Sequence, residues 1–470
     1  MVFSSTLFLF YFLPLFLLVY FATPKIAKNY VSLGFSLFFY AWGAPEFIFF
    51  LLGSCLLDFF LVKAVEKNGK RISLVLSLIL NVGLLVYFKY ANFFVENVNS
   101  LSDSFGMGGI EWKKIALPIG VSFFTFQKIS YALDVYRKKS PAQGNFANYL
   151  LYITLFPQLI AGPIVRYGDV VNQLSNRDES INMKLVGMFR FIIGLAKKVL
   201  IANVMGAQVS ALYGLGIENL TGGQAWLAAI AFTFQIYFDF SGYSDMAIGL
   251  GKMIGFKFPE NFNFPYLSRS ITEFWQRWHM TLSAWMRDYL YVPLGGNRKG
   301  PFRTYLNLFL VFFISGFWHG AAWNFVVWGC FHGVFLVIER LFLKKILDRI
   351  PGVLSVLYCF FLVLVGWVFF STKTIDQSWT LLEKMFSTDM SFATFDLRFK
   401  FIFFLIVAVL FSFFAFRKTW LIKANNFQDT LANQRPIVVL GTTICLSFLL
   451  ILSAAEIVAD GFNPFLYYRF

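Results

Sequence analysis

Histidine is the residue type best suited to acid–base chemistry near neutral pH, and this chain has only three, His279, His319 and His332. His319 follows Trp318 and precedes Gly320 at the end of a long apolar run. An ionisable side chain at membrane depth is costly unless it faces a cavity or a partner, and desolvation favours the neutral imidazole that a general base requires. His319 is therefore a candidate base. A buried histidine that bridges two helices explains the same residue equally well.

His279 lies in a tryptophan-rich segment that supports two interpretations. Trp275 and Trp278 flank it, and Ser283 and Arg287 follow at i+4 and i+8, on the same face of a helix. A polar face of this kind could bind a substrate. An aromatic belt at the membrane interface would contain the same tryptophans, although belts seldom need a histidine beside charged residues.

His332 follows His319 by 13 positions. In an unbroken helix this spacing would separate the two side chains by roughly 20 Å along the axis and place them on different faces. They can serve one reaction centre only if the chain bends at Gly320 or Asn324. No pair of histidines has the i, i+3 or i+4 spacing common in helical ligand sets, so we expect no metal.

Two acidic residues, Asp239 and Asp245, lie in an otherwise apolar stretch that Lys252 follows. Acids at membrane depth are normally paired or face a cavity. They could form a path for protons or substrate, and a structural network with lysine or tyrosine is at least as good an explanation.

The composition indicates a polytopic all-α membrane protein. Of the 470 residues, 58% are hydrophobic and 14% charged, and a soluble fold could not cover that much apolar surface. The net charge of +15 comes from short basic clusters between apolar runs, which is the positive-inside pattern and not a nucleic-acid-binding surface. Lys25 and Lys28 follow the first span, so the N-terminus is expected outside. The sequence lacks the glycine-rich phosphate-binding and nucleophile-elbow motifs.

Apolar windows long enough to cross the hydrocarbon predict about 11 to 13 membrane helices, some of them broken or re-entrant. The clearest windows are Ser4–Tyr20, Phe47–Val62, Ile72–Tyr87, Ala225–Phe238, Leu308–Phe317, Val353–Phe370, Phe401–Phe416 and Ile437–Leu452. Met188–Val204 carries three basic residues, and Leu150–Val165 contains two prolines and a glycine, which predicts a broken helix.

The region Lys257–Arg303 mixes charged and aromatic residues without an uncharged run long enough to span a bilayer. It should lie at an interface or line a cavity. Ser270 and Glu273 have capping-box spacing, and Pro293 follows, so we predict one helix from Ser270 to Tyr291.

Several motifs together resemble the membrane-bound O-acyltransferase (MBOAT) family, and most closely its bacterial branch that contains the membrane subunit of alginate O-acetylation. They extend over nearly the whole chain: Phe156–Pro163, Phe238–Asp245, Pro259–Phe262, Trp275–His279, Leu294–Asn297, Trp318–Gly320 and Pro464–Phe470.

The resemblance implies that His319 is the catalytic histidine and that His279 is the second polar site residue, where many eukaryotic members have asparagine. The role of His332 stays open. The family fold implies a ring of helices around a thinned centre, where a cytoplasmic tunnel for the acyl donor meets a pocket for the acceptor. The remaining substrate-binding candidates are Trp275, Trp278, Ser283, Arg287, Asp245, Asn261 and Trp318.

The predicted function is O-acetylation of an extracytoplasmic polysaccharide, an alginate-like exopolysaccharide or peptidoglycan. Acetyl-CoA or another acyl thioester would be the donor substrate, with no permanently bound cofactor. Because the sequence shows no esterase-like extracytoplasmic domain, a separate periplasmic O-acetyltransferase is the expected partner, and the bacterial inner membrane is the expected location. D-alanyl transfer to teichoic acid would use the same chemistry.

A second class of function is a proton-coupled transporter or flippase for a lipid-linked sugar, against which the absence of an inverted repeat argues. For the organisation of the chain we expect one integral-membrane domain over residues 1–470. Within it, residues 1–112 would form N-terminal helices, 113–345 the catalytic core and 346–470 C-terminal helices.

Overall fold

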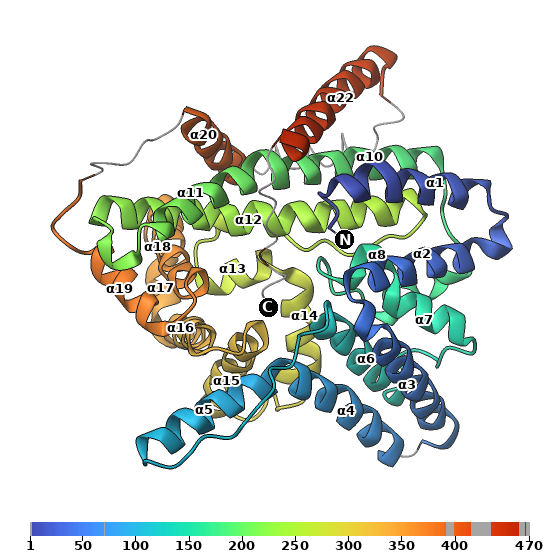
Figure 1. Ribbon diagram of the computed structural model, residues 1–470, viewed down its shortest axis with the longest axis horizontal. Helices are drawn as coiled ribbons and strands as arrows, with labels where there is room; N and C mark the ends of the chain where they lie inside the picture. Colours follow the sequence, from blue (N-terminus) through green and yellow to red (C-terminus); the bar gives the residue numbers. More distant parts are fainter. Residues whose placement is uncertain (1, 70, 392–398, 415–433, 460–465, 467–470) are drawn as a thin grey trace. The chain divides into compact units, whose positions relative to one another are not determined.

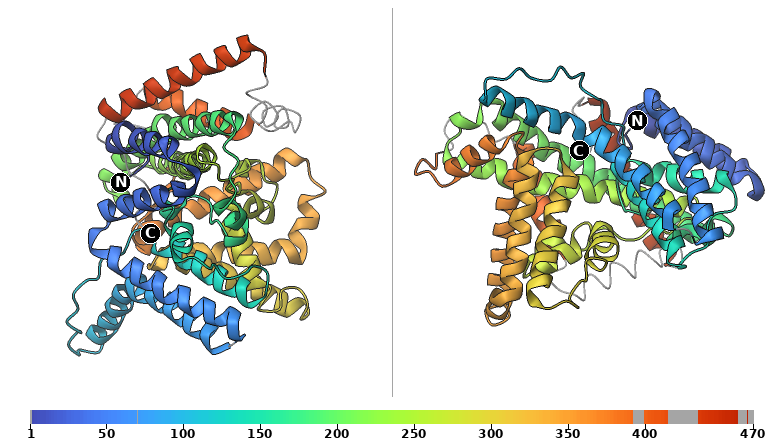
Figure 2. Two further views of the ribbon diagram at one scale, coloured as in Figure 1. Left: turned by 90° about the vertical axis from the view of Figure 1, so that its right-hand side faces the viewer. Right: turned by 90° about the horizontal axis from the view of Figure 1, so that it is seen from below.

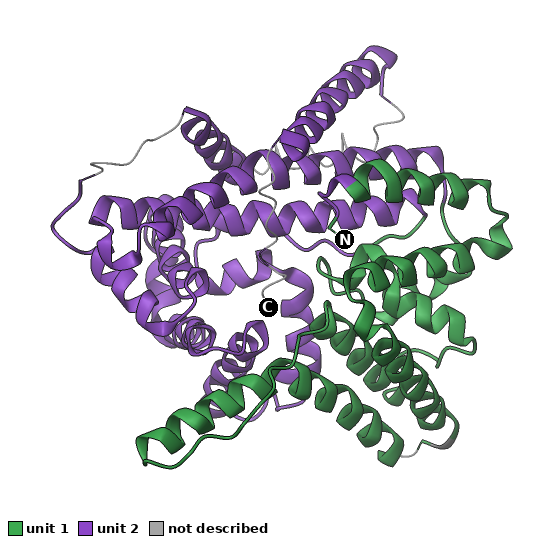
Figure 3. Cartoon of the chain, in the orientation of Figure 1, with its two compact units in different colours: residues 1–2, 7–178, 255–258 green, residues 3–6, 179–254, 259–470 purple. Residues whose placement is uncertain are grey.

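The structure is a computed structural model that describes the chain except for residues 1, 70, 392–398, 415–433, 460–465 and 467–470. Every regular element among the described residues is helical, which confirms the all-α prediction (Figure 1). The chain forms two compact units (Figure 3). Unit 1 comprises residues 1–2, 7–178 and 255–258, and unit 2 comprises residues 3–6, 179–254 and 259–470.

Unit 1 is a set of short and medium helices in which α3 packs against α4, α6 and α7. Its α-helices are α1 (Leu13–Ala22), α2 (Lys28–Gly43), α3 (Ile48–Asn68), α4 (Arg71–Leu85), α5 (Ala91–Ser104), α6 (Val121–Tyr136), α7 (Phe146–Thr154), α8 (Phe156–Leu159) and α9 (Tyr167–Val170). The helix break expected between Leu150 and Val165 is confirmed, because α7 ends at Thr154 and α8 begins at Phe156.

Unit 2 contains the three histidines. Its α-helices are α10 (Ile181–Ala196), α11 (Asn203–Gly214), α12 (Gly222–Met253), α13 (Ile271–Arg277), α14 (Met280–Met286), α15 (Pro301–His319), α16 (Trp323–Ile338), α17 (Lys344–Leu347), α18 (Gly352–Ser371), α19 (Ile375–Met385), α20 (Phe399–Phe413) and α22 (Pro436–Ala459). Two π-helical segments, Lys197–Ala202 and Glu339–Leu343, join consecutive helices, and a third, Arg287–Tyr291, extends α14.

The two units do not coincide with the three stretches expected from the sequence, 1–112, 113–345 and 346–470. The boundary lies near residue 178, because α6 and α7 pack with the N-terminal helices α2, α3 and α4. C-terminal helices likewise join the histidine-bearing unit, since α18 packs against α12 and α16. That the chain is a single domain stays a prediction.

Five helical stretches among the described residues are long and apolar enough to cross a membrane. They are Pro45–Lys67, Arg71–Ser104, Trp323–Leu347, Gly352–Ser371 and Pro436–Ala459. Phe8–Ala22 and Phe399–Phe413 are apolar but shorter. The polytopic prediction is confirmed, whereas the count of 11 to 13 stays a prediction. Part of the predicted span Phe401–Phe416, and all of the C-terminal motif except Leu466, lie outside the described residues.

Helix α12 is the centre of unit 2, with α10 beside it along much of its length (Figure 1). Glycines allow this approach: a Cβ atom on Gly194 would lie 2.5 Å from the carbonyl oxygen of Gly242, and one on Gly249 would lie 2.6 Å from that of Gly187. The other side of α10 packs against α22 (Figure 2). The side chains of α22 are mostly exposed and apolar.

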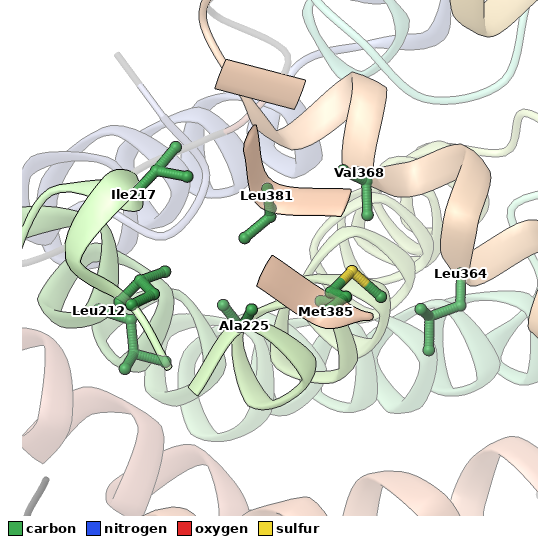
Figure 4. Close-up of a cluster of buried hydrophobic side chains, with 10 residues drawn as sticks. Leu212, Ile217, Ala225, Leu364, Val368, Leu381 and Met385 are labelled. Atoms are coloured by element: carbon green, nitrogen blue, oxygen red, sulfur yellow. The ribbon is translucent and has the colours of Figure 1, made fainter. Parts of the chain in front are cut away.

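The end of α12 that begins at Gly222 is fixed by a small apolar cluster. Leu212 of α11, Ala225 of α12, Leu364 of α18 and Met385 of α19 are buried together there (Figure 4). Trp226 packs against this cluster, and its indole N–H donates to the carbonyl oxygen of Met385 at 2.6 Å. The core therefore holds α18 and α19 against α12.

Candidate active site

The predicted helix from Ser270 to Tyr291 is broken at His279, so the prediction of one continuous helix was wrong. Ser270 does cap α13 as expected, since its side chain accepts the amide N–H of Glu273. The helix then ends at Arg277, and His279 adopts a left-handed conformation with φ +42° before α14 begins at Met280. Left-handed backbone is uncommon for residues other than glycine and calls for stabilising contacts.

Asn261 and its neighbours supply those contacts. The backbone N–H of Met280 donates to the carbonyl oxygen of Asn261 at 2.9 Å, and the N–H of Asn263 donates to the carbonyl oxygen of Arg277 at 2.9 Å. Backbone groups that the broken helix cannot satisfy are therefore paired with a segment about 18 residues upstream. The conformation of His279 depends on this long-range pairing.

The side chain of Asn261 also fixes the tautomer of His279. The backbone N–H of Thr281 can only donate, and together with the Thr281 hydroxyl it faces Asn261 Oδ1, at 3.4 and 2.8 Å. The amide oxygen is thus identified, and the 3.0 Å contact from His279 Nδ1 to the same atom must be an N–H donation. The lone pair of the neutral ring is therefore on Nε2.

His279 is fully buried, and its Nε2 has no hydrogen-bond partner within the described part of the chain. It lies outside the five candidate spans. Burial lowers its pKa well below the usual value, and a charge on His319 would lower that pKa further. The two histidines are thus close enough to interact electrostatically, and His279 is neutral at physiological pH.

The helical hairpin of α15 and α16 positions His319. Gly316 and Gly329 face each other where the two helices meet: a Cβ on Gly316 would lie 2.4 Å from the carbonyl oxygen of Phe325, and one on Gly329 would lie 2.4 Å from that of Phe312. This close backbone contact brings the last turn of α15 against the first half of α16. Gly320 ends α15 in an extended conformation, which is the bend that the sequence analysis required.

His319 is the last residue of α15 and is 2% exposed. Its Nδ1 lies 2.7 Å from the carbonyl oxygen of Ser315, one turn earlier. A carbonyl oxygen only accepts, so Nδ1 carries the proton and the neutral ring has its lone pair on Nε2. This is the tautomer in which Nε2 can take a proton from a substrate.

His319 and His332 come together because both contact the indole of Trp328. The ring of Trp328 lies 4.8 Å from that of His319 and 5.1 Å from that of His332, between ring centroids. Trp318 and Phe370 also enclose His319, at 4.9 and 5.7 Å. The hairpin folds the chain back between the two residues, so His319 and His332 lie in one aromatic environment despite their 13-residue spacing.

The sequence comparisons place this arrangement among known proteins. The sequence model of the MBOAT, membrane-bound O-acyltransferase family, matches residues 121–346, which include all three histidines. Proteins named probable alginate O-acetylase AlgI are 45% identical in Pseudomonas aeruginosa, over 82% of this chain and 75% of that protein, and 40% identical in Azotobacter vinelandii, over 100% of both. The peptidoglycan O-acetyltransferase of Helicobacter pylori is 37% identical, over 82% of this chain and 80% of that protein.

The chain belongs to the membrane-bound O-acyltransferase family. The predicted family and enzyme class are thereby confirmed: this is a multi-pass membrane protein and an O-acyltransferase. The assignment of individual residues to the O-acyltransferase reaction depends on the site geometry alone.

Three of the predicted site residues contact the histidines of this O-acyltransferase, and a fourth, Trp278, precedes His279 in the chain. Asn261 binds His279 directly, Trp318 contacts His319, and Trp275 lies 5.2 Å from the ring of His332. Trp278 is 1% exposed and packs against Phe274 and Trp367.

The other three predicted residues have different surroundings. Ser283 is half-buried on α14, and its amide N–H donates to the carbonyl oxygen of His279. Arg287 is exposed and forms an ion pair with its neighbour Asp288 at 2.7 Å. Asp245 lies on α12 and pairs with Arg190 and Lys197, as described next. Substrate binding by these residues stays a prediction.

The acidic residues of α12 belong to an ionic layer between α12 and α10. Asp245 is paired with Arg190 at 2.8 Å and with Lys197 at 2.6 Å, and Arg190 also contacts Glu260. These are the contacts expected of a structural network, the second explanation that the sequence allowed.

Asp239, six residues before Asp245 on α12, forms an ion pair with Lys198 at 2.7 Å, with both side chains only 2% exposed. Lys197 and Lys198 interrupt an apolar stretch in the sequence, and the structure places them in the π-helical segment that follows α10. A π-helical turn changes the direction of successive side chains, which lets both lysines reach α12.

The sequence analysis missed Trp328, the side chain that links two of the histidines. A usable signal was present, because Trp328 precedes His332 by one helical turn and therefore shares its face of α16.

Proposed function

We propose that this O-acyltransferase transfers acetyl groups from acetyl-CoA for the O-acetylation of an extracytoplasmic polysaccharide, an alginate-like exopolysaccharide or peptidoglycan. The observation that carries the proposal is the state of His319: a buried imidazole whose Nδ1–H is held by Ser315, so that its lone pair is on Nε2. The names of the relatives, alginate and peptidoglycan O-acetylating proteins, support acetyl as the group transferred.

In this mechanism Nε2 of His319 removes the proton of an acceptor hydroxyl. The resulting oxygen nucleophile attacks the thioester carbonyl carbon, so that a C–O bond forms and an oxyanion develops. The oxyanion then collapses, the C–S bond breaks, and the thiolate of CoA takes the proton from His319. General base catalysis of this kind contributes typically about 10²–10⁴-fold, and positioning of the two substrates contributes further.

A second polar residue in this site could orient the acyl donor or hydrogen-bond the oxyanion. The neutral ring already donates its only proton to Asn261, so its Nε2 can accept a hydrogen bond but cannot donate one. The geometry therefore supports the first role, in which His279 orients a ligand group that carries a donor. The hydrogen bonds to the oxyanion must come from other groups.

The proposal includes a location and a partner. We place the protein in the inner membrane with its N-terminus outside, because Lys25 and Lys28 follow the first apolar helix. A separate periplasmic O-acetyltransferase would carry the acetyl group to the polymer. CoA is a substrate here and not a resident cofactor.

The test measures acyl release from radiolabelled acetyl-CoA by purified full-length protein in liposomes. His319→Gln should reduce acetyl turnover by at least about 10²-fold at an unchanged melting temperature. Trp226→Phe is the control. Its indole packs against the apolar cluster at the start of α12, so this variant should retain turnover. Histidine-independent turnover, or proton-coupled flux without an acyl product, would contradict the proposal and favour a transporter.

A further inference from the structure

Around the histidines several buried polar atoms have no hydrogen-bond partner among the described residues. The indole nitrogens of Trp275 and Trp328 and both ring nitrogens of His332 make no hydrogen bond to the described residues. Trp328 and His332 are fully buried and Trp275 is 6% exposed. Buried polar groups are nearly always hydrogen-bonded in native proteins, and an unsatisfied one is destabilising. Three such side chains in contact indicate that a polar ligand group belongs there.

The three rings form a compact triangle. Their centroids are 5.6 Å apart between Trp275 and Trp328, 5.2 Å between Trp275 and His332, and 5.1 Å between Trp328 and His332. The ring planes are steeply inclined to one another, at 71°, 89° and 75°. The rings are thus not stacked face to face. The triangle also adjoins the proposed base, because Trp328 contacts His319.

The hydrogen-bonding groups of the three rings determine which kind of ligand atom they can bind. An indole N–H can donate a hydrogen bond but cannot accept one, so Trp275 and Trp328 require an acceptor atom. The proposed reaction offers one beside His319, the carbonyl oxygen of the acyl group, which gains negative charge as the hydroxyl attacks. His279 cannot supply the donor in its neutral form, as shown above.

We propose that Trp275, Trp328 and His332 bind the carbonyl oxygen of the acyl donor and stabilise the oxyanion that develops on it. This inference rests on the proposed acyl transfer and adds the groups that this reaction lacked. The two indole N–H groups donate to the oxygen, and His332 donates a third hydrogen bond from whichever nitrogen carries its proton. Fixed donors in a site that excludes water are effective because they need no reorganisation during the reaction.

The packing of His332 fits a fixed donor. Gly366 of α18 faces its imidazole, and a Cβ atom at that position would lie 3.1 Å from His332 Nε2. The glycine thus provides the space in which the ring lies. Phe274 stacks parallel to the imidazole at 6.3 Å, with an angle of 7° between the planes. Packing holds the ring from several sides, and it makes no hydrogen bond within the part of the chain that the structure describes.

The test replaces the indole N–H of Trp328 and leaves the ring. Trp328→Phe is the simple variant, and incorporation of 3-benzothienylalanine at position 328 keeps the size and shape of the side chain with sulfur in place of N–H. We expect kcat for acetyl transfer to fall about 10²-fold with little change in KM, which is typical for loss of one oxyanion donor. The same two replacements at Trp226, whose N–H donates to Met385, are the matched control and should leave kcat unchanged.

The outcomes separate this inference from the proposed function. If wild-type turnover depends on His319 and the benzothienyl variant keeps kcat within about threefold, the oxyanion assignment is wrong and the acyltransferase mechanism stands. If wild-type turnover does not depend on His319, the proposed function itself fails. A fall in kcat restricted to position 328, with the melting temperature unchanged, supports the inference.

Discussion

Two regions of unit 2 differ in how their buried polar groups are paired. Between α10 and α12, basic side chains are paired with acids: Lys198 with Asp239, and Arg190 and Lys197 with Asp245. Around the histidines, Trp275, Trp328 and His332 have polar atoms that make no hydrogen bond to any described residue. Buried ion pairs of this kind are typical of a structural network, whereas unsatisfied donors and acceptors in contact with one another indicate a site that a ligand completes. We therefore infer that the ionic layer stabilises the fold and that the aromatic site carries out the reaction.

The comparison predicts the largest loss of stability for Lys198→Met. This variant leaves the carboxylate of Asp239 buried beside an apolar side chain, and breaking a buried ion pair in this way typically costs about 3–5 kcal/mol. Thermal unfolding in detergent measures the loss, while kcat per folded molecule should stay near the wild-type value.

The double variant Lys198→Met/Asp239→Asn is the control, because it removes both charges and should recover part of the stability. If Lys198→Met instead unfolds like the wild type, the ionic layer is not the structural element that we describe.

The helical hairpin that carries His319 should be sensitive at Gly329. Alanine there places a Cβ atom 2.4 Å from the carbonyl oxygen of Phe312, so α15 and α16 must separate. We expect a loss of about 1–3 kcal/mol, typical of overpacking, together with a clear fall in turnover. Gly441→Ala on α22, where no atom lies within 4 Å of the added methyl group, is the matched control and should change neither quantity. Equal behaviour of the two variants would argue against hairpin packing as the device that positions His319.

The smallest predicted effect is a pH dependence of stability. The folded-state pKa of His279 is lowered by burial, whereas an unfolded histidine titrates near 6.5. Below pH ~6.5 the unfolded chain therefore binds a proton that the folded chain does not, and this contribution to stability falls as the pH decreases, by at most about 1.4 kcal/mol per pH unit.

His279→Asn removes that contribution. Between pH 7.5 and 5.5 its melting temperature should fall less steeply than that of the wild type. Parallel curves for the two proteins would show that His279 is not held neutral by burial.

Local patterns in the sequence were enough for part of the site. His319 stood out because an imidazole follows a long apolar run, and the need for a bend at Gly320 followed from the 13-residue spacing to His332. Ser270 was recognised as a helix cap from its spacing to Glu273. Each of these features depends on residues close together in the chain.

Features that depend on distant residues could not be predicted in this way. The break at His279 is stabilised by backbone hydrogen bonds to Asn261 and Asn263, so helical periodicity alone gave a continuous helix. The partners of Asp245 lie on another helix, about 50 positions away, which left its structural and functional interpretations equally open. Trp328 was missed because a tryptophan in an apolar helix resembles any other core residue until its neighbours are known.

The division between a structural ionic layer and a catalytic aromatic site is tested most directly by measuring kcat and melting temperature together for His319→Gln and Lys198→Met in liposomes. We expect opposite effects. Turnover of His319→Gln should fall by at least about 10²-fold at an unchanged melting temperature. The melting temperature of Lys198→Met should fall while its turnover per folded molecule is unchanged. If both variants lose both properties in proportion, or if His319→Gln stays active, the division between a structural ionic layer and a catalytic aromatic site is contradicted.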